Sequence, residues 1–98
     1  MPINELYLKR QREHTKQRAV ERYHRPFNRS DYRILTAKIR EGDAVFLEMC
    51  KDAAALWAVK YERRWFVTCF DLKTQQVSSL YPRFYLVKYR DIIFGTKT

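Results

Sequence analysis

The chain has 98 residues, which is enough for one hydrophobic core but not two, so a single domain over residues 1–98 with one small site is expected. Its 46% hydrophobic and 15% aromatic residues exclude a globally disordered protein. The formal net charge of +9 favours a polyanionic partner, such as RNA, DNA or an acidic protein, over the alternative that the charge serves only solubility.

Residues 1–27 are predicted to form a basic helix. Neither Gly nor Pro occurs between Glu5 and Arg25, and helix-forming residues dominate. Pro26 ends the helix, because the residue before a proline is disfavoured in helical geometry. The apolar stripe of this helix is thin and consists of Leu8, Thr15, Ala19, Val20 and Tyr23.

A second helix is predicted over residues 28–42. Asn28 or Ser30 can cap its N-terminus, and Gly42 can end it. Its apolar side is formed by Ile34, Leu35, Ala37, Lys38 and Ile39.

After Gly42 the hydrophobic period becomes that of strands, so residues 44–82 are predicted to form an antiparallel meander. Four β-branched and aromatic runs follow one another: Ala44–Cys50, Ala55–Tyr61, Arg64–Phe70 and Gln76–Tyr81. Between the second and third runs only Glu62 and Arg63 remain, which indicates a tight hairpin. The predicted fold class is therefore α+β, with two N-terminal helices packed on one face of a four- to five-stranded antiparallel sheet.

Residues 83–98 contain "FYLVKY", which alternates like a strand, followed by Ile92, Ile93 and Phe94. We predict an additional, fifth strand that covers these apolar side chains. The alternative is a tail that binds a partner, including a second copy of the chain in a homodimer.

The most distinctive feature of the first helix is a line of cationic side chains. Arg10, His14, Arg18 and Arg22 are spaced by four residues and therefore share one helical face, and Arg25 and Arg29 follow closely. Like charges on one face repel unless an anion occupies it. The face is either a solvated surface of a basic protein or a surface that lies along a phosphate backbone.

His14 stands inside this line of charge. Neighbouring cations lower the pKa of a histidine and favour its neutral form. A neutral imidazole beside arginines can act as general base on a ribose 2′-hydroxyl, while the arginines stabilise the pentavalent phosphate. The structural alternative is a histidine that only packs, and His24 is a weaker candidate because it lies roughly 80° around the helix from His14.

In the predicted sheet, basic residues alternate with aromatic ones. Lys60, Arg63 and Arg64 lie beside Trp57, Tyr61 and Trp65. This combination suits binding of nucleotides by charge and ring stacking. The tryptophans could equally belong to the core.

Other site classes find no support in the sequence. No pair among His14, His24, Cys50 and Cys69 has metal-ligand spacing, and the only glycines, Gly42 and Gly95, form no phosphate-binding loop, so neither a metal nor a cofactor is expected.

The cysteines and the apolar runs bear on the compartment. On strands two spacings apart, Cys50 and Cys69 would be roughly 10 Å from each other, too far for a disulfide, so they are expected to be buried thiols. No apolar run approaches the roughly 20 residues of a membrane span, and no apolar signal region begins the chain. We therefore expect a soluble, cytoplasmic protein with no membrane partner.

The order of residues resembles that of a family of small phage and prophage proteins. The resemblance rests on three stretches, "HTKQRAVERY", "SDYRILTAKIREGDAV" and "WAVKYERRWFVTCFDLKTQQVSSLYP", and covers about Glu13 to Pro82. The family pattern has a histidine four residues before an arginine, an ERY on the first helix, I-x-x-G at the end of the second helix and V-x-x-L-x-P at the end of the last strand.

The layout is also similar to that of the ribonuclease-toxin superfamily of barnase, colicin and RelE types. That resemblance implies RNA cleavage, with His14 as the helical histidine, Arg18 and Arg22 as the helical arginines, and Ser79 at the usual threonine position near the end of the last strand. The serine itself, and Thr15 in place of a small residue after the histidine, depart from the pattern. The last sixteen residues have no counterpart.

The leading functional hypothesis is a phage or mobile-element protein that acts on nucleic acid, RNA before DNA, as a metal-independent endoribonuclease in the host cytoplasm. The catalytic candidates are His14, Arg18, Arg22 and Ser79, and the nucleic-acid-binding candidates are Arg10, Arg25, Arg29, Lys60, Arg63 and Arg64. The alternative is a non-catalytic phage protein that binds and inhibits a host nucleic-acid or defence complex, and a third is a small assembly factor. An enzyme needs His14, whereas a binding protein does not.

Overall fold

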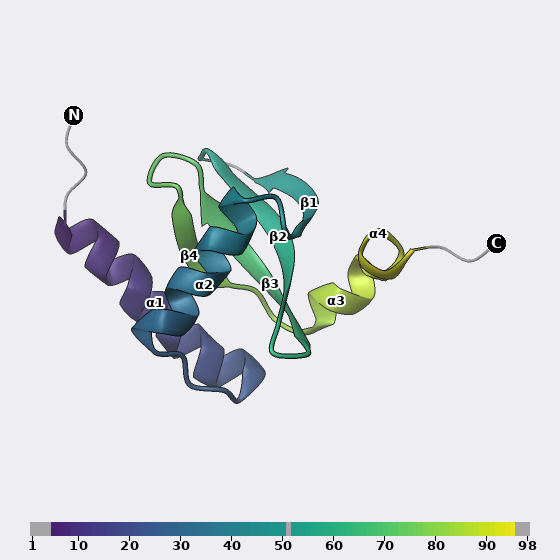
Figure 1. Cartoon of the computed structure of the whole chain (residues 1–98), viewed down its shortest axis with the longest axis horizontal. Helices are drawn as coiled ribbons and strands as arrows, with labels where there is room; N and C mark the ends of the chain where they lie inside the picture. The colour runs from purple at the N-terminus through teal and green to yellow at the C-terminus, as the bar shows by residue number, and fades with distance from the viewer. Residues whose placement is uncertain (1–4, 51, 96–98) are drawn as a thin grey trace.

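The computed structural model describes residues 5–50 and 52–95, which form four helices and four strands (Figure 1). In chain order these are α1 (Glu5–Tyr23), α2 (Arg29–Arg40), β1 (Val45–Cys50), β2 (Ala54–Tyr61), β3 (Arg64–Asp71), β4 (Gln76–Leu80), α3 (Phe84–Lys88) and α4 (Arg90–Phe94). The predicted α+β class, with two N-terminal helices on an antiparallel sheet, is confirmed.

The four strands pair in the order β1-β2-β3-β4, all antiparallel, as expected for a meander. Tyr61 pairs with Arg64, so Glu62 and Arg63 alone form the turn between β2 and β3. Both turn residues have positive φ, 51° and 65°, which is the geometry that matches the right-handed twist of the flanking strands. The tight hairpin predicted at these two residues is therefore present.

Helix α2 begins and ends where its sequence signals indicated. The Asn28 side chain accepts a hydrogen bond from the backbone N–H of Asp31 at 2.8 Å, and the Asp31 carboxylate accepts one from the backbone N–H of Asn28 at 2.9 Å. This reciprocal pair satisfies two N–H groups that the first turn leaves without helical partners. Gly42 follows the last turn with φ of 79°, a conformation that glycine adopts without steric cost.

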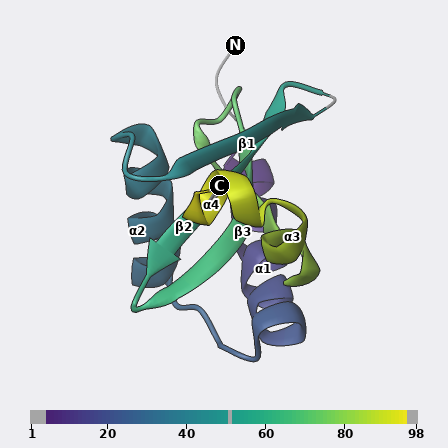
Figure 2. The same ribbon diagram turned by 90° about the vertical axis from the view of Figure 1, so that its right-hand side faces the viewer.

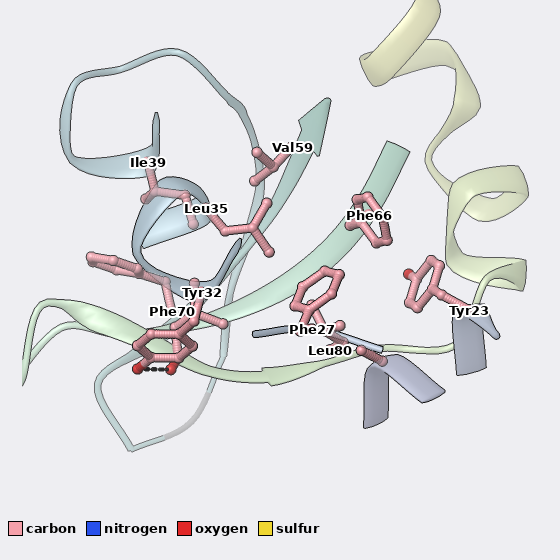
Figure 3. Packing of buried hydrophobic residues seen from close by; sticks show 11 residues of the cluster. Tyr23, Phe27, Tyr32, Leu35, Ile39, Val59, Phe66, Phe70 and Leu80 are labelled. Carbon is pink, nitrogen blue, oxygen red and sulfur yellow. Dashed lines mark hydrogen bonds between the residues drawn. The ribbon is translucent and has the colours of Figure 1, made fainter. Parts of the chain in front are cut away.

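The first face of the sheet is covered by α1 and α2, and the main core lies between these helices and the sheet (Figure 3). Helix α1 contributes residues spaced by four: Gln11, Thr15, Ala19 and Tyr23. Val20, expected in the apolar stripe, is instead exposed, because it lies about 100° around the helix from the buried line. The Tyr23 hydroxyl joins α1 to the sheet, donating to the Tyr81 carbonyl at 2.7 Å and accepting from the Val67 N–H at 2.9 Å.

The prediction of a fifth strand is wrong, because residues 84–94 form the short helices α3 and α4. These helices lie on the side of the sheet away from α1 and α2, and α4 stands in front of the strands in Figure 2. Tyr85, Tyr89 and Ile93 are spaced by four residues, which is a helical period, and all three face the second apolar cluster. In that cluster Tyr89 and Ile93 are buried against sheet residues Leu47, Leu56, Ala58 and Val67. The sheet is thus covered on both faces, not on one as expected.

Candidate active site

A cleft of about 480 Å³ brings together all four residues that the sequence marked as catalytic. His14, Arg18 and Arg22 line one wall from α1, and Ser79 lines the wall opposite from β4. The remaining lining residues are Cys69, Tyr81, Pro82, Phe84 and Tyr85. The cleft therefore lies where α1, the edge of the sheet and the start of α3 meet.

The packing of α1 on the sheet explains why these side chains converge. Each of the three cleft residues of α1 directly precedes a buried residue of that helix, namely Thr15, Ala19 or Tyr23. Since α1 packs mainly on β4, side chains at these preceding positions flank this strand. β4 is the last strand in the sheet order, and Ser79 pairs with Cys69 on its inner neighbour β3. The edge is consequently left for α1 and α3 to enclose.

Hydrogen bonds hold the two arginines in different ways. Arg22 Nη1 donates to the Leu80 carbonyl at 2.6 Å, which fixes its guanidinium beside β4 next to Ser79. Arg18 Nη1 donates to Glu21 Oε1 at 2.7 Å across one turn of the helix. Arg18 Nε is buried and has no hydrogen-bond partner among the described residues. Arg22 is thus pre-positioned beside Ser79, whereas within the described residues Arg18 is tied only to its own helix.

The surroundings of His14 favour its neutral form. Burial, together with the positive charges of Arg18 and Arg22, lowers the pKa of His14 below its usual 6.5. At neutral pH the imidazole is then unprotonated and able to accept a proton. Nearby, burial raises the pKa of Tyr81, so its hydroxyl stays protonated. The cleft holds a proton acceptor and a protonated hydroxyl at the same pH.

Aromatic side chains that the sequence reasoning missed form a third wall. The rings of Tyr81 and Tyr85 meet edge to face with centroids 5.1 Å apart, and those of Phe84 and Tyr85 are 4.6 Å apart. Phe84 is largely exposed. The sequence signal for this wall is the aromatic run "YPRFY" directly after β4. Because the sequence predicts a strand after Pro82, it does not indicate that these rings lie beside the cleft.

Of the predicted nucleic-acid-binding residues, Arg10 extends the site along α1. Arg10 is exposed and lines a shallow hollow of about 700 Å³ together with Lys9 and His14. Because His14 lines both this hollow and the cleft, the cationic face of α1 continues into the cleft.

Arg25 is bound within the protein. It forms ion pairs with Asp31, at 3.3 Å, and with Glu62. Its guanidinium also lies over the rings of Phe27 and Tyr61, 5.0 and 5.3 Å from their centroids. These contacts connect the segment between α1 and α2 to the β2–β3 turn. Arg25 does not line the cleft.

The remaining basic candidates are divided among three places. Arg64 Nη2 donates to the Tyr23 carbonyl at 2.8 Å and so caps the C-terminus of α1. Lys60 and Arg63 are exposed at the β2–β3 hairpin and do not line the cleft. Arg29 lies at the start of α2 and lines a separate groove between the two N-terminal helices.

The tryptophans that could have stacked on bases pack within the protein instead. Trp57 is partly buried against the first core cluster, and Trp65 against the second. Trp65 also meets the Phe94 ring edge to face at 5.5 Å. Of the two alternatives for these residues, their positions match the core.

The cysteines and possible metal ligands bear on other kinds of site. Cys50 and Cys69 are free thiols, and burial raises the pKa of each. Within residues 5–50 and 52–95, no group of three or more His, Cys, Asp or Glu side chains is placed to hold a metal ion. None of the helices in this described part combines the length and apolarity needed to cross a membrane.

The chain matches no protein-family model, no curated protein and no solved structure. The resemblance to phage proteins and to ribonuclease toxins therefore stays a prediction, and the proposal of a function rests on the cleft.

Proposed function

We propose that this protein is a metal-independent endoribonuclease and that the cleft between α1, β4 and α3 is its active site. The observation that carries the proposal is the convergence of His14, Arg18, Arg22 and Ser79 on one cleft. These residues come from two elements more than fifty positions apart in the chain. Their chemistry, a base, two cations and a hydroxyl, is what phosphodiester cleavage through a ribose hydroxyl requires.

In the proposed reaction, neutral His14 takes the proton of the ribose 2′-hydroxyl. The 2′ oxygen then attacks the adjacent phosphorus, and the bond from phosphorus to the 5′ oxygen breaks. Arg18 and Arg22 offset the negative charge that builds up on the phosphate oxygens, and the Ser79 hydroxyl donates to one of them. The leaving 5′ oxygen takes a proton, for which the protonated Tyr81 hydroxyl in the cleft lining is the candidate donor. The products are a 2′,3′-cyclic phosphate and a 5′-hydroxyl.

This mechanism selects RNA over DNA because only RNA carries the attacking hydroxyl. The wall formed by Phe84 and Tyr85 favours a single-stranded substrate, since an exposed ring beside a phosphate site can stack on an unpaired base. Both features favour an orientation with the phosphate against α1 and the base against α3.

The two histidines offer a matched pair for testing the proposal. Purified wild type, His14→Asn and His24→Asn are incubated with RNA and with DNA of the same sequence, with a chelator present. His24 is exposed and has a positive φ of 54°, a conformation that asparagine tolerates, so its variant is a control that leaves the fold intact. We expect wild type and His24→Asn to cleave RNA alone, and His14→Asn to lose at least about a hundredfold in rate. Equal rates for the two variants would exclude His14 as the base.

The second candidate function, a non-catalytic protein that binds and inhibits a host nucleic-acid or defence complex, is favoured by a different observation. The C-terminal helices leave four large apolar side chains exposed, namely Phe84, Val87, Ile92 and Phe94. Such side chains suit a protein partner. This function predicts no cleavage by any of the three proteins. A phage or mobile-element origin and a location in the host cytoplasm belong to both proposals and rest on the sequence resemblance.

A further inference from the structure

A groove between α1 and α2, separate from the cleft, concentrates unpaired positive charge. It has a volume of about 450 Å³, and four arginines line it: Arg12, Arg29, Arg33 and Arg40. None of the four belongs to a salt bridge within the described residues. The single acidic residue of the lining, Glu41, is exposed at the rim. Apart from Glu41, the lining of the groove therefore supplies no negative side chain to these cations.

One arginine of the groove is fixed by a hydrogen bond to the backbone, and another stands at a position that a helix disfavours for a cation. Arg40 Nε donates to the Gln75 carbonyl at 2.7 Å. Burial raises the pKa of Tyr32 to about 12, and the charges of Arg12 and Arg40 act on its hydroxyl against that of Asp71. Arg29 lies in the first turn of α2, where the helix dipole is unfavourable to a cation. Charge kept at an unfavourable position, beside three other cations, indicates a ligand that offsets it.

The groove is connected to the cleft by shared lining residues. His14 lines both the cleft and the shallow hollow on α1. Lys9 lines that hollow and a further one of about 510 Å³, which in turn shares Arg12 and Arg29 with the groove. Lys9, Arg10 and Arg12 therefore lie along α1 between the cleft and the groove, although Glu5 and Glu13 also line the two hollows.

We propose that the α1–α2 groove is a second anion-binding site that holds phosphates of the nucleic-acid strand whose other part occupies the cleft. An acidic protein is the other conceivable occupant. Protein interfaces, however, are centred on desolvated apolar and aromatic side chains, and the lining of the groove contains no exposed large apolar side chain. A strand of phosphates needs only cations along its path. The proposal rests on the proposed function because it assumes that a nucleic-acid strand occupies the cleft, but it does not require that the protein cleaves this strand.

The test uses strands that cannot be cut, so that its outcome does not depend on catalysis. Binding of fluorescent 2′-O-methyl RNA is measured by anisotropy over a range of salt concentrations. One oligonucleotide is only long enough for the cleft, and the other is several times longer. The groove variant is Arg29→Glu with Arg33→Glu. The control is Lys73→Glu with Arg90→Glu, which lowers the net charge equally at exposed residues outside the groove and the cleft.

We expect the groove variant to bind the long strand about tenfold more weakly than the control does, with a salt slope reduced by roughly 0.7 for each phosphate that the groove no longer neutralises. Binding of the short strand should be the same for both. Because Arg29→Glu places an anion in the first turn of α2, the groove variant should melt no lower than wild type, which separates weaker binding from impaired folding. Equal binding of the long strand by both variants would overturn the proposal. So would a groove variant that keeps the long strand but no longer binds polyglutamate, because the occupant would then be an acidic protein.

Discussion

The two faces of the sheet are covered to different degrees. On the first face α1 and α2, of 19 and 12 residues, enclose a cluster of eleven buried residues. On the second face α3 and α4 have five residues each, and only Ile93 of α4 and Tyr89, which joins the two helices, are buried. A helix of barely more than one turn presents only one or two side chains to the sheet, so its remaining side chains stay exposed. The first face therefore holds a fully covered core, whereas the second face is covered by helices that leave part of their own apolar surface exposed.

The candidate active site lies at the border between these faces. α1 belongs to the well-covered first face and contributes His14, Arg18 and Arg22, whereas α3 belongs to the more open second face and contributes exposed Phe84. Catalytic groups gain from rigid support, and a substrate needs an accessible approach. The difference between the faces thus provides both at one position.

Removing α3 and α4, which cover the second face of the sheet, should have the largest effect on stability. A chain cut after Pro82 loses α3 and α4 and exposes the sheet residues of the second cluster, including Leu56 and Val67. Each buried side chain of this size contributes about 1.5–3 kcal/mol, and one kcal/mol corresponds to about 4–8 °C in a domain of this length. Thermal unfolding should show a melting temperature lower by ten degrees or more, about the sum of two such side chains, with an aggregating product.

The alternative for this segment is that it binds a second copy of the chain in a homodimer. In that case the shortened chain would melt like the parent, and sedimentation would change from dimer to monomer. This result would mean that the C-terminal helices serve an interface and not the second face of the sheet.

Single substitutions can compare the two covers directly. Ile92 and Ile93 are adjacent in α4, but Ile92 is 53% exposed and Ile93 only 9%. In urea unfolding we expect Ile93→Ala to cost about 2–3 kcal/mol and Leu35→Ala, fully buried on the first face, about 3–5 kcal/mol. Ile92→Ala should stay within about 0.5 kcal/mol of wild type. A loss at Ile93 no larger than that at Ile92 would show that α4 does not stabilise the sheet.

The sequence was sufficient to predict the fold up to Pro82 because local signals and packing agree there. Asn28 caps α2, Gly42 marks the change from helical to strand period, and Glu62 with Arg63 form the hairpin. The C-terminal segment was wrongly predicted because "FYLVKY" alternates over a short run. Tyr85, Tyr89 and Ile93 have helical spacing, but this spacing indicates a helix only once the apolar second face of the sheet, against which they pack, is known.

The candidate site was predictable on one side only. Spacing by four placed Arg10, His14, Arg18 and Arg22 on one face, and the structure brings the last three to a single cleft with Ser79. Sequence spacing could not show that Arg25 is neutralised by Asp31 and Glu62, since Asp31 lies beyond the helix end at Pro26 and Glu62 comes from a distant part of the chain. The aromatic wall was missed because the segment that forms α3 is predicted from its sequence to be a strand.

The smallest expected effect concerns the charge balance of the cleft. Removing positive charge with Arg18→Gln and Arg22→Gln should raise the pKa of His14 toward 6.5, while burial keeps it below that value. The pH at which the imidazole becomes neutral thus moves upward, as measured by NMR titration of the ring protons. Arg10→Gln, one turn away on the same face, should leave the titration unchanged. A midpoint at or above 6.5 in wild type would contradict the electrostatic account of the cleft.

The central claim is that the cleft cleaves RNA through the ribose 2′-hydroxyl with His14 as base. It is tested most directly with an RNA that carries one 2′-deoxynucleotide on the 5′ side of a mapped cleavage position. The account predicts that cleavage stops at this position alone, and that the other positions still yield 2′,3′-cyclic phosphate and 5′-hydroxyl ends. Continued cleavage at the substituted position would contradict it, because the attacking group would then be something other than the ribose hydroxyl.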